Sequence, residues 1–278
     1  MKSCALVCCS DGRKNDEREL ISRLELILSQ MGVTCTEYGS LFCRDGRCYS
    51  DTPQSRAMAL CRAFSDGPDY IFDISGGNIA NEMLPYLDYD VIASSRSVLW
   101  GYSDLTSVIN AVFAVTGKCS VLYQIKNIVG SCAELQQKRF RSFLSGDENA
   151  LFSPRTEIYC GQPGNGIVIG GNLRCFLKLA GTPYFPGTEG RILLLESLSA
   201  DEAGLRTGLS QLGQMGVFEN AGGVICGSFS RLKKAGLSDL PAELISDITK
   251  GRIPVMQTDD IGHGSDSMAV RIGCPLRL

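Results

Sequence analysis

Short apolar runs alternate with amphipathic segments over the first 125 residues, and this alternation constrains the fold more than any other feature. The apolar runs predict buried strands at residues 4–9, 33–39, 70–75, 97–103 and 119–125. The amphipathic segments predict helices at residues 17–32, 55–67 and 107–118. Strands that are separated by helices form right-handed crossovers and hence a mostly parallel sheet. We therefore predict an α/β fold.

This rhythm changes twice along the chain. Residues 83–94 predict a short helix and then a strand, with the break at Pro85. Residues 127–165 hold a polar helix and a stretch rich in turn-forming residues. A length of 278 residues suits two domains of roughly 150 residues each. We therefore predict an N-terminal domain over residues 1–150 and a smaller α/β domain over residues 151–278.

The predicted second domain repeats the α/β pattern. Its strands are expected at residues 166–171, 191–196, 222–229 and 253–258. Its helices are expected at residues 201–215 and 241–250.

The composition argues against several classes of protein. No apolar run reaches the roughly 18 residues that a transmembrane helix needs. A net charge of −3 and a pI near 5.4 argue against a general nucleic-acid binder, which needs clustered positive charge. We therefore expect neither a nucleic acid nor a membrane as partner.

Thirteen cysteines are unusual, but they do not predict a disulfide framework, because their number is odd and the chain is long. The apolar start of the chain is too short for the core of a signal peptide. We therefore expect reduced thiols that pack as small apolar residues in a cytoplasmic protein. No metal is expected, because there is one histidine and no C-x-x-C pair; the closest cysteines are Cys35, Cys43 and Cys48.

Ser103 lies in GYSDLT (101–106), where a predicted strand turns into a helix. A serine at such a turn points its hydroxyl away from the sheet edge, and the first amides of the following helix are unpaired donors. This is the layout of a nucleophile elbow, although Leu105 stands where the usual pattern has a glycine. Alternatively, Ser103 or Asp104 only caps the helix, which is the more frequent explanation of such a hexapeptide.

Two Gly-Gly-Asn sequences follow predicted strands, at residues 76–78 and 170–172. Parallel sheets collect ligands at the carboxyl ends of their strands, so the first of these loops and Ser103 are predicted to face one crevice. Adjacent glycines let backbone amides approach an oxygen closely, in an oxyanion hole or a phosphate cradle. The alternative is a tight turn from strand to helix.

His263 is the only histidine, and it lies between two glycines directly after a predicted strand. On its own it would be interpreted as an exposed loop residue. Glu196 ends a fully apolar strand, where an ionised carboxylate is costly unless it is paired. Glu196 either caps the turn that follows it or orients an imidazole. Asp259 and Asp260 are alternatives for the second role.

A serine, an acid and a histidine thus occur in this order, each just past a predicted strand. Serine is a weak nucleophile, so it needs an imidazole within hydrogen-bond reach, and the imidazole needs an acceptor that fixes its tautomer. Only His263 can supply that base. The set predicts a serine hydrolase. The competing hypothesis is a non-catalytic α/β module whose Gly-Gly-Asn loops hold a phosphate or nucleotide.

Several stretches resemble serine peptidase family S66, which comprises the L,D-carboxypeptidases and the microcin C self-immunity peptidases. They cover residues 75–92, 101–107, 170–197 and 259–264, in this order across nearly the whole chain. The resemblance implies a flavodoxin-like N-terminal domain, a smaller C-terminal domain of the swivelling β/α type, and a homodimer. It implies no metal and no organic cofactor.

The resemblance also implies roles for single residues. The catalytic residues would be Ser103, Glu196 and His263. The oxyanion hole would be formed by the backbone amides of Gly77 and Asp104. Contacts with a small peptide substrate are expected from Gly76, Asn78 and Asn172. The implied reaction is hydrolysis of the amide bond between an L-centre and a terminal D-amino acid, such as D-Ala of a murein tetrapeptide in peptidoglycan recycling.

Some departures from the family pattern concern the substrate. Ser75 stands where L,D-carboxypeptidases commonly have an arginine, and a Gly-Pro motif is absent at residues 123–125. The stretch 75–92 is closer to the immunity branch, so the alternative function is an amidase that acts on peptidyl-nucleotide conjugates. The tryptophan with which some immunity enzymes stack a nucleotide cannot be placed, because the only tryptophan, Trp100, is predicted to lie in a strand core.

Overall fold

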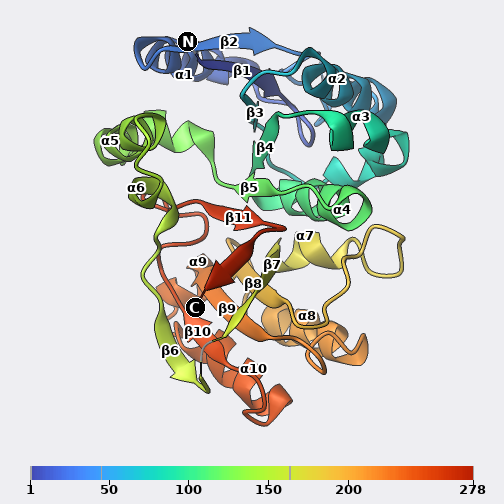
Figure 1. Ribbon diagram of the computed structural model, residues 1–278, viewed down its shortest axis with the longest axis vertical. Helices are drawn as coiled ribbons and strands as arrows, with labels where there is room; N and C mark the ends of the chain where they lie inside the picture. The colour runs from blue at the N-terminus through green and yellow to red at the C-terminus, as the bar shows by residue number, and fades with distance from the viewer. Residues whose placement is uncertain (1, 45, 163, 278) are drawn as a thin grey trace.

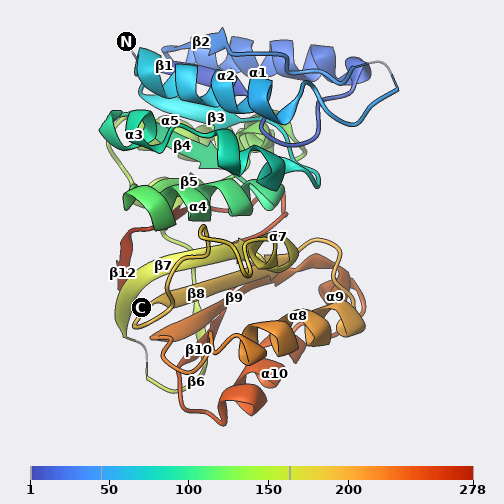
Figure 2. The same cartoon turned by 90° about the vertical axis from the view of Figure 1, so that its right-hand side faces the viewer.

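Two six-stranded sheets lie one above the other in the computed structural model, which describes residues 2–44, 46–162 and 164–277 (Figures 1 and 2). The first sheet has the order β11-β5-β4-β3-β1-β2. Its strands are β1 (Lys2–Val7), β2 (Val33–Glu37), β3 (Tyr70–Asp73), β4 (Val98–Gly101), β5 (Ser120–Leu122) and β11 (Val270–Ile272). Strands β1 to β5 are parallel, and β11 is antiparallel to β5. The order 2-1-3-4-5 is that of flavodoxin-like folds, which confirms the expected N-terminal architecture.

Helices cover both faces of the first sheet (Figure 2). One face packs against α1 (Arg18–Gln30) and α5 (Ala133–Leu144). The opposite face packs against α2 (Pro53–Asp66), α3 (Tyr89–Ser94) and α4 (Thr106–Thr116). Because side chains alternate along a strand, Cys4 and Leu6 enter the first of these layers while Ala5 and Val7 enter the second. A strand that is buried on both faces explains the uninterrupted apolar run at the start of the chain.

The second sheet has the order β12-β7-β8-β9-β10-β6. Its strands are β6 (Glu157–Cys160), β7 (Asn165–Asn172), β8 (Ile192–Ser197), β9 (Gly223–Phe229), β10 (Val255–Gln257) and β12 (Pro275–Arg277). The four central strands are parallel, and the two edge strands are antiparallel to their neighbours. Its helices are α7 (Leu173–Leu177), α8 (Glu202–Gln214), α9 (Ser230–Lys234) and α10 (Leu240–Thr249). The prediction of a second α/β unit is confirmed.

The segment around Pro85 differs from its prediction. It forms the 3-10 helix η2 (Ala80–Tyr86) and then α3, so the strand expected within residues 83–94 is wrong. The side chain of Asp88 accepts hydrogen bonds from the amides of Asp90 and Val91, which caps α3 and starts a helix where the apolar residues indicated a strand. The remaining short helices are η1 (Asn15–Glu17), η3 (Ser103–Leu105), η4 (Ile125–Val129) and α6 (Asn149–Phe152).

The chain returns to the first sheet near its end. After β10 it forms β11 beside β5 and then re-enters the second sheet as β12 (Figure 1). The domain boundary near residue 150 stays a prediction; β11, which that boundary assigns to the second domain, lies in the first sheet. None of the helices in the described ranges is long and apolar enough to cross a bilayer.

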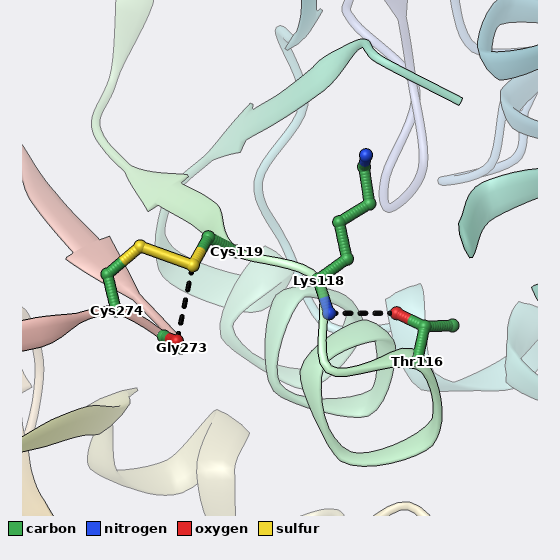
Figure 3. The surroundings of a disulfide bond; sticks show 5 residues. All are labelled: Thr116, Lys118, Cys119, Gly273 and Cys274. Atoms are coloured by element: carbon green, nitrogen blue, oxygen red, sulfur yellow. Dashed lines mark hydrogen bonds between the residues drawn. A yellow bond between two sulfur atoms is a disulfide. The ribbon is translucent and has the colours of Figure 1, made fainter. Parts of the chain in front are cut away.

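A disulfide joins Cys119 to Cys274 across 155 residues of sequence (Figure 3). Cys119 directly precedes β5, and Cys274 lies between β11 and β12. The antiparallel pairing of these segments brings the two Cα atoms to 5.8 Å, a separation that suits a disulfide. The expectation of reduced thiols throughout is therefore wrong for this pair. Other cysteines, such as Cys9 and Cys175, are free and buried as small apolar residues.

Candidate active site

Ser103 lies at the sharp turn between β4 and α4. Its φ angle is 52°, in the left-handed region that costs a non-glycine residue about 1–3 kcal/mol. The turn is tight enough that a Cβ on Gly101 would lie 2.7 Å from Cβ of Leu105. No side chain caps η3 or α4, so the hypothesis that Ser103 or Asp104 is only a helix cap is wrong. Strain at a strand-to-helix turn is typical of a nucleophile elbow.

His263 and Glu196 form a buried pair at the carboxyl ends of two strands of the second sheet. Nδ1 of His263 lies 2.7 Å from Oε2 of Glu196, and the two side chains are 8% and 2% exposed. A carboxylate can only accept, so Nδ1 carries the proton and Nε2 is the acceptor of the neutral ring. Asp259 instead pairs with Lys233, and Asp260 accepts from the Arg155 amide.

Nε2 of His263 is buried and has no hydrogen-bond partner among the described residues. It belongs to a narrow pocket that is also lined by Ser103, Glu196, Tyr102 and Gln124. A buried polar atom without a partner costs about 1–3 kcal/mol and needs an explanation, which a catalytic role of Nε2 in this pocket would supply. The predicted nucleophile and the predicted base thus line the same pocket, and no hydrogen bond joins them in the described structure.

The pKa of His263 is shifted by its surroundings. Burial opposes protonation of the ring, but the hydrogen bond and the negative charge of Glu196 outweigh it and raise the pKa of His263 above the usual 6.5. The positive charge of Arg174 acts in the opposite direction. The imidazole is thus a stronger base than a free one.

The loop that carries His263 is held by side chains from the N-terminal part of the chain. The side-chain amide of Asn127 donates to the Gly264 carbonyl at 3.3 Å. The side-chain amide of Gln136 donates to the Ser265 and Ser267 carbonyls at 3.0 and 2.8 Å. These bonds fix the loop between β10 and β11 against η4 and α5. The convergence of Ser103 and His263 thus depends on contacts between the two halves of the chain.

The first Gly-Gly-Asn loop follows β3 and lies against the turn after β1. A Cβ on Gly77, whose φ angle is 133°, would lie 2.1 Å from Cγ of Asp11, so only glycine fits there. A Cβ on Gly76 would lie 3.0 Å from the Tyr102 hydroxyl. The Asp11 carboxylate accepts from the Asn78 amide at 2.9 Å. This places the predicted oxyanion loop beside the residue that precedes Ser103.

The carboxylate of Asp104 ties this loop to the nucleophile turn. It is fully buried and accepts from the Ser10 hydroxyl at 2.6 Å and from the Ala80 amide at 2.8 Å. The ammonium of Lys178, from the second half of the chain, also donates to the Asp104 carboxylate. It donates as well to the Asn78 carbonyl at 2.7 Å. Sequence reasoning assigned the backbone amide of Asp104 to the oxyanion hole, considered the residue otherwise only as a helix cap, and missed Lys178. A charged residue directly after an apolar strand was the available signal for the carboxylate.

The second Gly-Gly-Asn sequence has a packing role. Asn110 of α4 donates to the Gly170 carbonyl and accepts from its amide, each at 2.8 Å. The amide of Asn172 donates to the Thr106 hydroxyl, and its side chain donates to Oε1 of Glu196 at 3.1 Å. The expected contact of Asn172 with substrate stays a prediction; in the structure its side-chain amide orients the carboxylate that pairs with His263. These backbone groups are occupied, which disfavours a phosphate cradle here.

Comparison with known proteins agrees with this arrangement. Residues 4–123 match the family model of the LD-carboxypeptidase N-terminal domain, and residues 165–278 match that of the C-terminal domain. The chain belongs to the LD-carboxypeptidase family, peptidase family S66. The resemblance identified from the sequence is confirmed, and the chain is a peptidase of this family.

Three relatives indicate the range of this family. YocD of Bacillus subtilis strain 168, assigned as a carboxypeptidase, is 29% identical over 82% of this chain and 78% of its own length. The microcin C7 self-immunity protein MccF of Escherichia coli is 25% identical over 75% of this chain and 70% of its own length. A Bacillus subtilis protein assigned as a murein peptide carboxypeptidase is 27% identical over 71% of this chain and 65% of its own length.

Solved structures show the same fold. MccF in complex with aspartyl sulfamoyl adenosine superposes with a TM-score of 0.83 at 20% identity and covers 99% of this chain and 92% of its own. The muramoyltetrapeptide carboxypeptidase of Oxalobacter formigenes superposes with a TM-score of 0.80 at 20% identity and covers 99% and 94%. Members of both branches therefore share the architecture of this chain.

Proposed function

We propose that the protein is a serine-type carboxypeptidase that hydrolyses the amide bond between an L-centre and a terminal D-amino acid. The observation that carries this proposal is the buried His263, whose Nδ1 is bound by Glu196 while its Nε2 has no partner in the described structure and shares a pocket with Ser103. An imidazole with one nitrogen fixed and the other available is what a serine nucleophile needs.

In the proposed reaction, Oγ of Ser103 attacks the scissile carbonyl while Nε2 of His263 takes its proton. The new oxyanion is stabilised by the backbone amides of Gly77 and Asp104. His263 then gives its proton to the leaving amine, and the D-amino acid departs. Water, deprotonated by His263, hydrolyses the acyl-enzyme and restores Ser103. Glu196 holds the ring in the required tautomer and stabilises the imidazolium.

The murein tetrapeptide is the substrate that we favour, with release of its terminal D-Ala. Relatives on this branch are named for murein peptide and muramoyltetrapeptide cleavage. The alternative is an amidase that acts on peptidyl-nucleotide conjugates, since MccF binds an aminoacyl sulfamoyl adenosine. Trp100, the only tryptophan, is 2% exposed within a cluster of aromatic side chains in the first sheet, so it is not available to stack on a nucleotide.

The two substrates are best assayed side by side. We expect the purified protein to release D-Ala from an L,D-linked tetrapeptide and to leave the diastereomer with terminal L-Ala intact. An aspartyl sulfamoyl adenosine should be cleaved much more slowly. Preferential cleavage of the nucleotide conjugate would instead support the alternative function, an amidase like those of the immunity branch. Nucleotide binding without any turnover would favour the non-catalytic module. A homodimer and a cytoplasmic location stay predictions.

Glu196→Gln should move the acid limb of the pH profile. The reaction needs neutral His263, so activity is present above the pKa of His263 and is lost as the pH falls through it. Glutamine keeps an oxygen but removes the charge that raises this pKa, so the acid limb should move to lower pH. We also expect kcat to fall by at least about 10²-fold at the optimum. The measurement is kcat/KM against pH; an unmoved acid limb in the variant would contradict the assignment of Glu196.

A further inference from the structure

Helix α7 and the residue that follows it direct two cations of the second half, Arg174 and Lys178, at the first Gly-Gly-Asn loop. The charge of Lys178 is neutralised, because its ammonium donates to the buried carboxylate of Asp104. Arg174, one turn earlier, is exposed, and its guanidinium donates to Oδ1 of Asn78 and, at 3.3 Å, to the carbonyl oxygen of Gly77. Both of its acceptors are neutral oxygens.

Arg174 forms no ion pair with a carboxylate within residues 2–44, 46–162 and 164–277. A guanidinium has five N–H donors, and two of them are used by the loop. The guanidinium of Arg174 therefore keeps a full positive charge and unused donors, whereas Lys178 is paired with the carboxylate of Asp104. Such a group is complementary to a carboxylate, which it binds through two parallel hydrogen bonds.

The position of Arg174 relates this charge to the reacting atoms. It contacts Gly77, whose amide is the proposed oxyanion donor, and its charge lies close enough to His263 to lower the pKa of that ring. A carboxypeptidase substrate carries its terminal carboxylate on the residue after the scissile carbonyl, and consecutive Cα atoms are about 3.8 Å apart. The anion that must be recognised thus lies one residue from the oxyanion.

We propose that Arg174 binds the terminal α-carboxylate of the substrate and thereby sets the preference for cleavage of the last residue. This inference rests on the proposed function, because it takes the substrate to be a peptide with a free carboxyl end. It adds a specificity-determining residue to the site: Arg174 contacts the leaving residue, while Ser103, Glu196 and His263 act on the bond.

The test compares two ligands that differ only at the terminus, the L,D-linked tetrapeptide and the same peptide ending in D-alaninamide. For the acid, Arg174→Ala should lower kcat/KM between about 10- and 100-fold, the loss expected for a charge-assisted pair in partly exposed surroundings. For the amide, the same variant should differ from the parent by less than about threefold. Arg174→Lys should recover part of the preference for the acid over the amide, because lysine keeps the positive charge but lacks the paired N–H donors of the guanidinium.

Binding separates this inference from the proposed reaction. Calorimetric titration of Ser103→Ala, in which we expect turnover to be at least about 10³-fold slower, should show tighter binding of the acid than of the amide. The double variant Ser103→Ala with Arg174→Ala should lose that difference. The matched control is Arg62→Gln on α2, where the arginine side chain is 78% exposed and its Nε lies 3.8 Å from the Asp66 carboxylate; this variant should keep the difference.

The outcomes are distinct. Equal losses on the acid and the amide would overturn the inference and make Arg174 a positioning residue of the glycine loop. Equal binding of the two ligands by Ser103→Ala would also overturn it. Preferential binding of the acid that depends on Arg174, in a wild-type protein that hydrolyses neither peptide, would support the carboxylate site and refute the proposed hydrolysis.

Discussion

Ser103→Ala should lower kcat on the L,D-linked tetrapeptide by at least about 10³-fold, because the variant has no oxygen to attack the carbonyl. The hydroxyl of Ser103 forms no hydrogen bond to another described side chain, so the melting temperature should stay close to that of the wild type. Activity is measured as released D-Ala, and stability by thermal unfolding of the same samples.

Two further variants sharpen this test. Ser94→Ala, on the exposed side of α3, is a matched serine that should keep full activity. The double variant Ser103→Ala with His263→Gln should be no slower than Ser103→Ala alone, since the residues of a triad act as a unit. If Ser103→Ala retained activity within about threefold of the wild type, the nucleophile would have to be another residue.

Lys178→Met should be the most destabilising of the substitutions considered. It removes the cation that neutralises Asp104, whose carboxylate is fully buried, and an uncompensated buried charge costs about 3–5 kcal/mol. In a protein of this size the melting temperature should fall by roughly 10 °C. Activity should fall as well, because Asp104 and Lys178 together hold the loop that carries Gly77.

A double-mutant cycle isolates the charge. Asp104→Asn keeps an acceptor for the Ser10 hydroxyl and the Ala80 amide but carries no charge, so the double variant with Lys178→Met should be more stable than Lys178→Met alone. The exposed Lys138→Met on α5 is the control for loss of a lysine. If the melting temperature of Lys178→Met equalled that of the wild type, the buried carboxylate of Asp104 would not need Lys178 for its stabilisation.

The sequence predicted the central elements because their patterns are local. Alternation of apolar runs and amphipathic segments located the parallel strands of both sheets, and Ser103, Glu196 and His263 were each recognised as residues at the ends of such strands. What periodicity could not do was choose between Glu196 and the two aspartates near His263. That choice came from the family resemblance, and the 2.7 Å contact of Glu196 with His263 agrees with it.

Features that depend on distant contacts were missed. The strands β6, β11 and β12 have three or four residues each and are defined by their partners rather than by a pattern of their own. The disulfide of Cys119 and Cys274 follows from one of these pairings. The contacts of Arg174 and Lys178 with the glycine loop join residues 96 to 100 positions apart, and no local spacing indicates them.

The return of β11 to the first sheet limits how this molecule can be divided. If the chain were cut between α6 and β6, the N-terminal fragment would lack β11, and β5 would become an exposed edge strand. Exposed edge strands pair with strands of other chains and thereby cause aggregation. The C-terminal fragment would contain β11 without β5, the strand with which it pairs. Neither fragment is a self-sufficient module, so recombination during evolution would have to transfer both together.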